Sequence, residues 1–104
     1  MLRVAVMYPN TIDADFDFDY FQYDHLPLVK KAYQAHGLVN LEFDIAVSTT
    51  GDNKAPYLAI AYLSFKDMAA FMAAMKAEGK MVNADVKNYT SIKPTIQISK
   101  SATC

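Results

Sequence analysis

The stretch YLAIAYLSFKDMAAFMAAMKAEG, Tyr57 to Gly79, decides the fold because its hydrophobic period changes once, near Phe65. Up to Phe65, apolar side chains occupy both sets of alternating positions, which predicts a strand that is buried on both faces. Ser64 then stands three residues before Asp67 in a capping arrangement, and an amphipathic helix is predicted from Asp67 to Gly79. Four side chains share one face of this helix: Met68, Phe71, Met72 and Met75.

Three further segments show the alternation that is typical of a strand. Residues 2–8 alternate until Pro9 ends them, and residues 40–47 alternate before the turn residues TTGDNKAP, which predict a hairpin with the strand quoted above. A last strand is predicted in residues 92–98 around three isoleucines. Pro94 lies within it and lacks the N–H that a central strand needs, so this strand is expected at an edge of the sheet.

Residues 17–35 follow a helical period instead. At about 100° per residue, their apolar side chains fall in one stripe, which predicts an amphipathic helix. Asp15 or Asp17 can cap its start, and Gly37 follows its end. The stripe consists of Phe18, Phe21, Leu28, Val29, Ala32 and Tyr33.

The order of the elements is therefore βαββαβ. With right-handed crossovers, this order predicts an α+β fold of the ferredoxin-like type: a four-stranded antiparallel sheet with two helices on one face. Residues 1–104 are expected to form a single domain. Two helices cover only one face of the sheet, whereas the strand from Tyr57 to Phe65 is apolar on both, so a second copy is expected to cover the other face in a homodimer.

Composition and charge limit the partners. A net charge of −1 with scattered Lys and Arg gives no basic stripe, so nucleic acid is not an expected partner. The single cysteine, Cys104, excludes a disulfide within the chain and favours a reducing compartment. No segment approaches the roughly 20 apolar residues of a membrane helix. A cytoplasmic protein that does not bind membranes is expected.

No metal site is expected from the acidic and histidine residues. His25 and His36 are about three helical turns apart, too far to share a metal ion. The acidic series that starts at Asp13 has the spacing of a calcium loop, but Phe18 stands where that loop needs glycine for its turn.

His25 is the residue of greatest chemical interest. It falls on the apolar stripe that faces the sheet, whereas Pro27 falls on the solvent side, where a proline bends a helix and opens space beneath it. A histidine on an apolar face is commonly a core residue that hydrogen-bonds a neighbour. Burial also lowers the pKa of an imidazole and keeps it neutral and basic, as proton transfer near neutral pH requires. Both readings of His25 remain open on this geometry.

Two segments carry a resemblance to a known family: MYPNTIDADFDFDYFQYDHLPLVKKA, starting at Met7, and NADVKNYTSIKPTIQIS, starting at Asn83. Their Tyr-Pro-Asn, His-Leu-Pro-Leu and Ala-Asp-Val motifs occur in the same order in the EthD family, which the chain resembles over essentially its whole length. The resemblance implies a homodimer in which two sheets face each other as an α/β-barrel, with a pocket between sheet and helices in each subunit.

The family histidine corresponds to His25, and the resemblance extends to decarboxylases and dehydratases and to a bacterial context of ether degradation. The leading hypothesis is a cofactor-independent enzyme of decarboxylase, dehydratase or isomerase type, in which His25 is the general acid or base for a small apolar or aromatic oxygenated compound. A non-catalytic binding or accessory protein of a degradation pathway is the alternative, and a purely structural dimer would leave no cavity at His25. The candidate substrate-binding residues are Tyr8, Asn10, Phe21, Tyr62 and Asp85.

Overall fold

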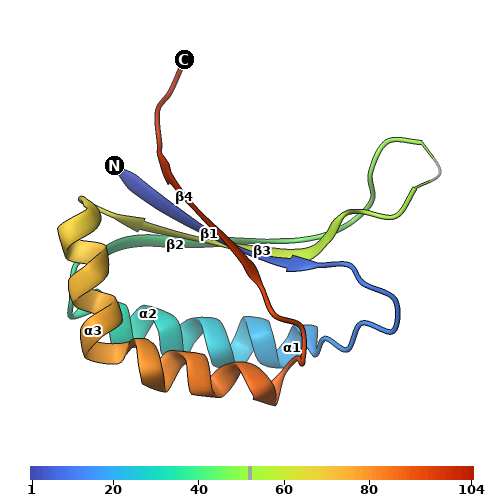
Figure 1. The fold of residues 1–104 in the computed structure, drawn as a ribbon, viewed down its shortest axis with the longest axis horizontal. Helices are drawn as coiled ribbons and strands as arrows, with labels where there is room; N and C mark the ends of the chain where they lie inside the picture. The colour runs from blue at the N-terminus through green and yellow to red at the C-terminus, as the bar shows by residue number, and fades with distance from the viewer. Residues whose placement is uncertain (52) are drawn as a thin grey trace.

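The computed structural model describes residues 1–51 and 53–104. It has one sheet, and its helices lie in a single layer on one side of that sheet (Figure 1). The strands occur in the order β2-β3-β1-β4, and each neighbouring pair is antiparallel. The α+β ferredoxin-like fold predicted from the sequence is thus confirmed. Its strands are β1 (Leu2–Pro9), β2 (Leu38–Ile45), β3 (Tyr57–Phe65) and β4 (Thr95–Lys100).

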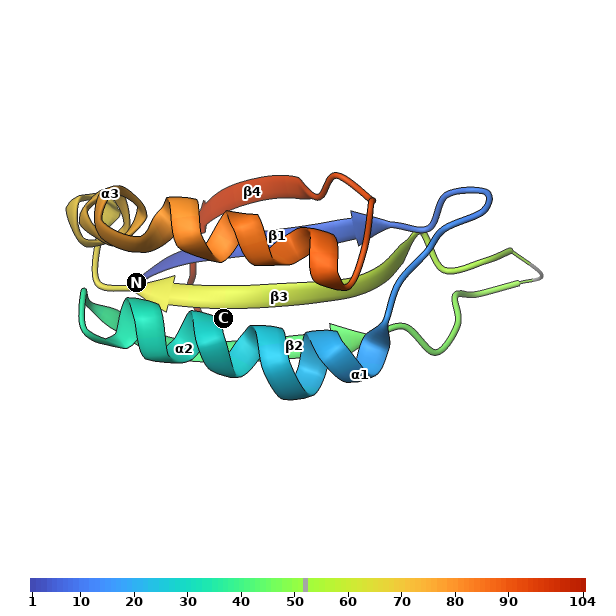
Figure 2. The ribbon, with the colours of Figure 1, turned by 90° about the horizontal axis from the view of Figure 1, so that it is seen from below.

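Two helical stretches run antiparallel to each other beneath the sheet (Figure 2). The first comprises α1 (Phe18–Tyr20), the π-helical turn η1 (Phe21–His25) and α2 (Leu26–Gln34); the second comprises α3 (Met68–Asp85) and the short 3₁₀ turn η2 (Val86–Asn88). The hydrophobic core fills the space between these helices and the sheet. Among the described residues, no helix combines the length and the apolar character needed to cross a membrane.

The register of the sheet assigns its side chains to two faces. Val4 lies opposite Leu63 on β3, and Tyr8 lies opposite Ala59. All four of these side chains are buried under the helices. The alternate residues of β3, such as Ile60 and Tyr62, point to the face that carries no helix in Figure 1. The central strand therefore has an apolar residue on each face, as its sequence indicates.

The first helix is interrupted by the π-helical turn where the sequence predicted a continuous α-helix. The Leu26 N–H bonds to the carbonyl of Phe21, five residues earlier. Pro27 follows directly and has no N–H to give to the carbonyl of Tyr23, so the regular ladder fails at this point. One extra residue in the turn rotates the following residues by about 100°. As a result, Leu26 is buried where Leu28 was expected to be.

The second helix differs from its prediction in length and in its buried face. It continues through Gly79 to Asp85, because Gly79 is buried and helical rather than a left-handed terminator. Its N-cap is Asp67, whose carboxylate accepts a bond from the Ala70 N–H, and Ser64 lies within β3 instead of capping the helix. Met68 and Met72 are exposed, so the predicted four-residue face is only half buried.

The last strand begins later than predicted. β4 starts at Thr95, so Ile92 and Pro94 precede it. Pro94 cannot donate to the ladder, which explains why pairing with β1 begins only after it. β4 is an edge strand, as the proline indicated. Caps and turns follow expectation elsewhere: Asp17 caps α1 through the Tyr20 N–H, and Gly37 has a φ of 98° after α2.

Candidate functional site

A cavity of about 100 Å³ lies between the sheet and the two helices. Val4 and Val6 of β1 and Leu63 of β3 form its floor, and Phe71 and Val82 of α3 belong to its helical wall. The lining is predominantly apolar. Four polar or ionisable side chains from separate elements also contribute to it: Tyr8, His25, Tyr33 and Asn83.

His25 reaches the cavity from the π-helical turn. Its side chain is only 4% exposed, and its ring lies 4.5 Å from the Tyr89 ring, measured between centroids. Residues five positions apart differ by about 140° in direction on an α-helix. Because η1 closes its hydrogen bonds over five residues, Tyr20 and His25 instead approach the same partner.

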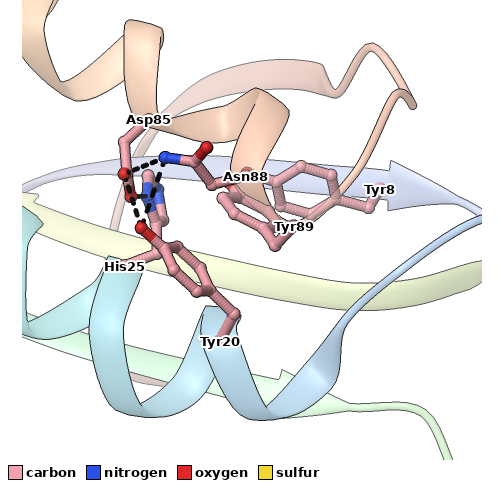
Figure 3. Close-up of polar contacts among 6 residues, drawn as sticks. All are labelled: Tyr8, Tyr20, His25, Asp85, Asn88 and Tyr89. Atoms are coloured by element: carbon pink, nitrogen blue, oxygen red, sulfur yellow. Dashed lines mark hydrogen bonds and ion pairs between the residues drawn. The ribbon is translucent and has the colours of Figure 1, made fainter.

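That partner is Asp85, the last residue of α3 (Figure 3). Its Oδ2 lies 2.9 Å from Nδ1 of His25. Its Oδ1 accepts from the Tyr20 hydroxyl at 2.8 Å and from the Asn88 amide nitrogen at 2.8 Å. We call Tyr20, His25, Asp85 and Asn88 the polar cluster. Both carboxylate oxygens are used within it, so Asp85 holds the two helices together at this point.

The polar cluster determines the charge on each partner. Burial raises the pKa of the Asp85 carboxyl, but hydrogen bonds from His25, Tyr20 and Asn88 outweigh it and leave this pKa below its usual value. Burial lowers the pKa of His25, and the bond to Asp85 only partly opposes this effect. Near neutral pH, the pair is therefore a carboxylate and a neutral imidazole.

The remaining ring nitrogen of His25, Nε2, belongs to a side chain that lines the cavity. An ionised carboxylate can only accept, so the Nδ1 of His25 must carry the proton and Nε2 must carry the lone pair. No hydrogen bond to Nε2 occurs among the described residues, and no fully buried side-chain nitrogen or oxygen among them lacks a partner. Nε2 is thus accessible from the cavity that His25 lines. It is a base next to apolar walls.

A second polar feature is the pair of hydroxyls on Tyr8 and Tyr89, which lie 2.6 Å apart. Burial raises the pKa of both, so both remain protonated at neutral pH. Two hydroxyls that share one hydrogen bond keep one hydrogen free. Tyr8 lines the cavity and Tyr89 does not, so Tyr89 can donate to Tyr8 while Tyr8 offers its hydrogen to a ligand.

The structure brings together four of the six residues predicted for the site. Tyr8, Phe21 and His25 line the cavity, and Asp85 stands behind His25 and outside the lining. The other two lie elsewhere. The Asn10 amide donates to the Ala55 carbonyl at 3.0 Å. Tyr62 points to the opposite face of the sheet, beside Arg3 at 5.9 Å from its ring centroid.

Sequence reasoning did not assign roles to Tyr20, Asn88 or Tyr89. Asn88 and Tyr89 lie in the segment NADVKNYTSIKPTIQIS, which also contains Asp85 and carries the family resemblance, so their signal was present. Tyr20 gave none, because an α-helical wheel directs it away from His25. Tyr89 also contacts the loop before α1, because its carbonyl accepts a hydrogen bond from the Asp17 N–H at 2.8 Å.

The described part of the chain contains no group of three His, Cys, Asp or Glu side chains placed to hold a metal ion. The cavity itself offers nitrogen from a single histidine, two phenol hydroxyls and the Asn83 amide at its rim. What the site supplies chemically is therefore one base, one hydroxyl donor and an apolar enclosure.

Comparisons with known proteins place this geometry in a family. An EthD-like protein from Ralstonia eutropha JMP134 has a similar structure, with a TM-score of 0.87 and 30% sequence identity over 95% of this chain and 89% of its own. An ethyl tert-butyl ether D (EthD) family protein from Bacillus halodurans C-125 superposes with a TM-score of 0.78 at 18% identity, covering 98% of this chain and 99% of its own.

More distant structures share the fold. One is SnoaB from Streptomyces nogalater, described as a cofactor-independent oxygenase, with a TM-score of 0.61 at 12% identity over 99% of this chain and 93% of its own. Among curated proteins, none matches the chain. The EthD domain matches residues 9–93, which include both the His25 segment and the Asp85 segment. The chain belongs to the EthD family.

Proposed function

We propose that this protein is a cofactor-independent enzyme that transfers a proton on a small apolar or aromatic oxygenated compound. One observation carries the proposal: Asp85 holds the proton of His25 on Nδ1, which leaves a lone pair on Nε2 of a ring that lines an apolar cavity. A neutral, oriented imidazole of lowered pKa is suited to act as a general base near neutral pH.

In the proposed reaction, Nε2 of His25 removes a proton from a carbon next to a carbonyl group. The electron pair of the broken C–H bond forms an enolate, and the Tyr8 hydroxyl donates a hydrogen bond to its oxygen. Asp85 stabilises the resulting imidazolium through the 2.9 Å contact with Nδ1. Return of the proton from the imidazolium to another atom gives isomerisation. In dehydration, the C–O bond to a β-hydroxyl breaks, and this hydroxyl takes the proton from the imidazolium and leaves as water.

A non-catalytic protein that binds a small molecule in the same cavity is the second candidate. It is favoured by the small number of reactive groups, since His25 is the one lining residue that titrates near neutral pH among those described. The apolar walls alone are sufficient to hold a small ligand. In this case, the polar cluster would only orient His25 as a hydrogen-bonding group.

Proton exchange at carbon distinguishes the two functions without knowledge of the natural substrate. Phenylacetone in D2O is an appropriate probe, and loss of its α-protons is followed by proton NMR. The parent should accelerate the exchange, and His25→Gln should reduce the acceleration roughly 100-fold or more, since an amide does not exchange protons near neutral pH. His36→Gln, a change at the exposed end of the helix, is the matched control. Equal rates with and without the parent protein would favour the binding function.

We also propose that the protein is a homodimer that joins through the open face of the sheet. The centre of this face carries Met7, Ile60 and Tyr62, and its β2 edge carries Glu42 and Asp44. An apolar centre with a polar rim is the usual pattern of a subunit interface. Sedimentation should give a dimer at micromolar concentration. Ile60→Asp should shift it to monomer, whereas Gln34→Asp on the exposed side of α2 should not. A monomeric parent would contradict the dimer. The proposed cytoplasmic location is independent of this test.

A further inference from the structure

The walls of the cavity carry no formal charge. No Lys, Arg, Asp or Glu side chain lines it among the described residues. Burial raises the pKa of the Tyr33 hydroxyl to about 12 and raises that of Tyr8, so both stay neutral. His25 is also neutral near pH 7. A ligand in this cavity therefore meets dipoles and apolar atoms, but no counter-ion.

A negative charge lies next to the cavity. Asp85 lies directly behind the His25 ring, with three donors satisfying its oxygens. Two lysines adjoin lining residues in the sequence, Lys87 after Val86 and Lys93 before Pro94, but both are exposed and neither lines the cavity. An anionic ligand would thus be buried near a like charge with no cation in contact. Such burial is strongly unfavourable.

A cationic ligand would not be stabilised in the cavity either. Both oxygens of Asp85 are already engaged, and this residue does not line the cavity. The Tyr33 hydroxyl already donates to the Met75 sulfur at 3.8 Å, and Asn83 lies at the exposed rim. Inside the cavity, the Nε2 lone pair of His25 and the Tyr8 hydroxyl remain, and together they can satisfy one hydroxyl or carbonyl group. The rest of the lining is apolar and suits hydrocarbon.

The cavity also limits size. Its volume of about 100 Å³ is somewhat smaller than the roughly 150 Å³ of an engineered cavity that holds benzene. Met75 lines it with a flexible thioether, and Asn83, which is exposed, forms part of its rim. One ring fits inside, and a short substituent can extend towards Asn83.

We propose that the ligand is an uncharged compound of about one ring, with a single carbonyl or hydroxyl group placed at His25 and Tyr8, and that the cavity rejects a carboxylate of the same shape. This inference rests on the proposed function only in using the same cavity. It concerns which ligand binds and makes no statement about turnover.

Benzamide and benzoate test the proposal, because they have the same shape and differ in charge. Each is titrated into the ¹³C,¹⁵N-labelled protein at pH 8, and the His25 ring signals are followed by NMR. Benzamide should shift these signals with at least about 100-fold higher affinity than benzoate, as an uncompensated buried charge requires. Benzoate binding at His25 with equal or higher affinity would overturn the proposal. Failure of both compounds to bind at millimolar concentration would overturn it as well.

Two measurements locate the bound benzamide. Intermolecular NOEs from its ring to the methyl groups of Leu63 and Val82 are expected, and NOEs to other sites alone would contradict the assignment. Ala61→Leu should fill the cavity and abolish binding, whereas Ala73→Leu on the exposed side of α3 should not. The NOEs decide the matter if Ala61→Leu fails to fold. Neutral-ligand selectivity can hold while proton exchange is absent, and the reverse, so the two proposals fail separately.

Discussion

The polar cluster and the cavity meet at one imidazole ring, yet they differ in their chemistry. On the Nδ1 side of His25, a carboxylate receives bonds from three side chains. On the Nε2 side, the surroundings are apolar apart from Tyr8 and Tyr33. The polar cluster determines where the proton lies on the ring, and the cavity determines which molecule reaches it. This difference teaches that protonation state and ligand choice are separable properties of the site.

Their structural origins differ as well. The polar cluster is built from two helical stretches: α1 with η1, and the last turn of α3 with η2. The contact between Asp17 and Tyr89 joins the two stretches. The cavity is built from strands and helix faces across the whole fold. A single substitution can therefore disable the polar cluster, whereas the cavity changes only when volume is added or removed.

Asp85→Asn should break the polar cluster with the largest effect. Tyr20 and Asn88 both donate to Oδ1, so the amide oxygen is expected at that position and the amide nitrogen at His25. The NH₂ group would donate to Nδ1 and move the ring proton to Nε2. Proton exchange should fall roughly 100-fold or more, because the cavity would then face an N–H instead of a base.

The ¹⁵N shifts of the His25 ring report the tautomer directly. Asp24→Asn is the matched control, because it removes the same charge from the exposed residue next to His25. The control should keep the parent tautomer. An unchanged tautomer in Asp85→Asn would mean that the ring is fixed by packing and would remove the proposed role of Asp85.

His25→Gln should change the dependence of stability on pH. Because the folded-state pKa of His25 is lowered, the unfolded chain takes up a proton below about pH 6.5 that the folded chain does not. The parent should therefore lose stability relative to His25→Gln as the pH falls from about 6.5 to the lower folded pKa. The slope is at most one proton, about 1.4 kcal/mol per pH unit.

Urea unfolding of both proteins between pH 5 and pH 8 measures this difference in unfolding free energy. A parent that gains stability relative to the variant on acidification would show that attraction to Asp85 outweighs burial. In that case, the imidazole would be charged at neutral pH and the base in the proposed reaction would be absent.

Much of the fold could be predicted because it depends on local patterns. The apolar run Tyr57–Phe65, which ends where the helical period begins, predicted both ends of β3 correctly. Pro94 indicated an edge strand, although it lies just before β4. Gly79 was misread because a glycine can end a helix or allow close packing, and only the tertiary contact decides which. Here, Gly79 is buried within α3, and α3 continues past it to Asp85, which contacts His25.

The site was predictable only in part, for a related reason. His25 was recognised from its apolar surroundings, but its pairing with Asp85 joins residues 60 positions apart. The π-helical turn that aligns Tyr20 with His25 depends on how the chain accommodates Pro27, which a regular helical wheel does not represent. Tyr62 was placed on the wrong face for this cavity, because both faces of β3 are apolar and alternation alone does not say which one the helices cover.

Tyr20→Phe should weaken the polar cluster without breaking it. It removes one donor to Oδ1 of Asp85, while Asn88 still donates to the same atom and His25 to the other. The midpoint of urea unfolding should fall slightly, with the His25 tautomer unchanged. Tyr23→Phe, on the exposed side of the same turn, is the control and should be silent in urea unfolding. A switched tautomer in Tyr20→Phe would show that Asn88 alone does not hold the carboxylate.

Tyr62→Phe should have the smallest effect on ligand binding, because the sheet separates its hydroxyl from the cavity. Tyr62 lies opposite Ala5 on β1, and its ring lies beside Arg3. The substitution keeps this ring and removes only the hydroxyl. Benzamide affinity should change by less than about twofold, within the range of a surface substitution. Tyr8→Phe removes the corresponding hydroxyl inside the cavity and should weaken benzamide roughly two- to tenfold. The same titration monitors both variants. Equal losses of benzamide affinity in the two variants would mean that the ligand contacts both faces of the sheet, which would contradict binding in the cavity alone.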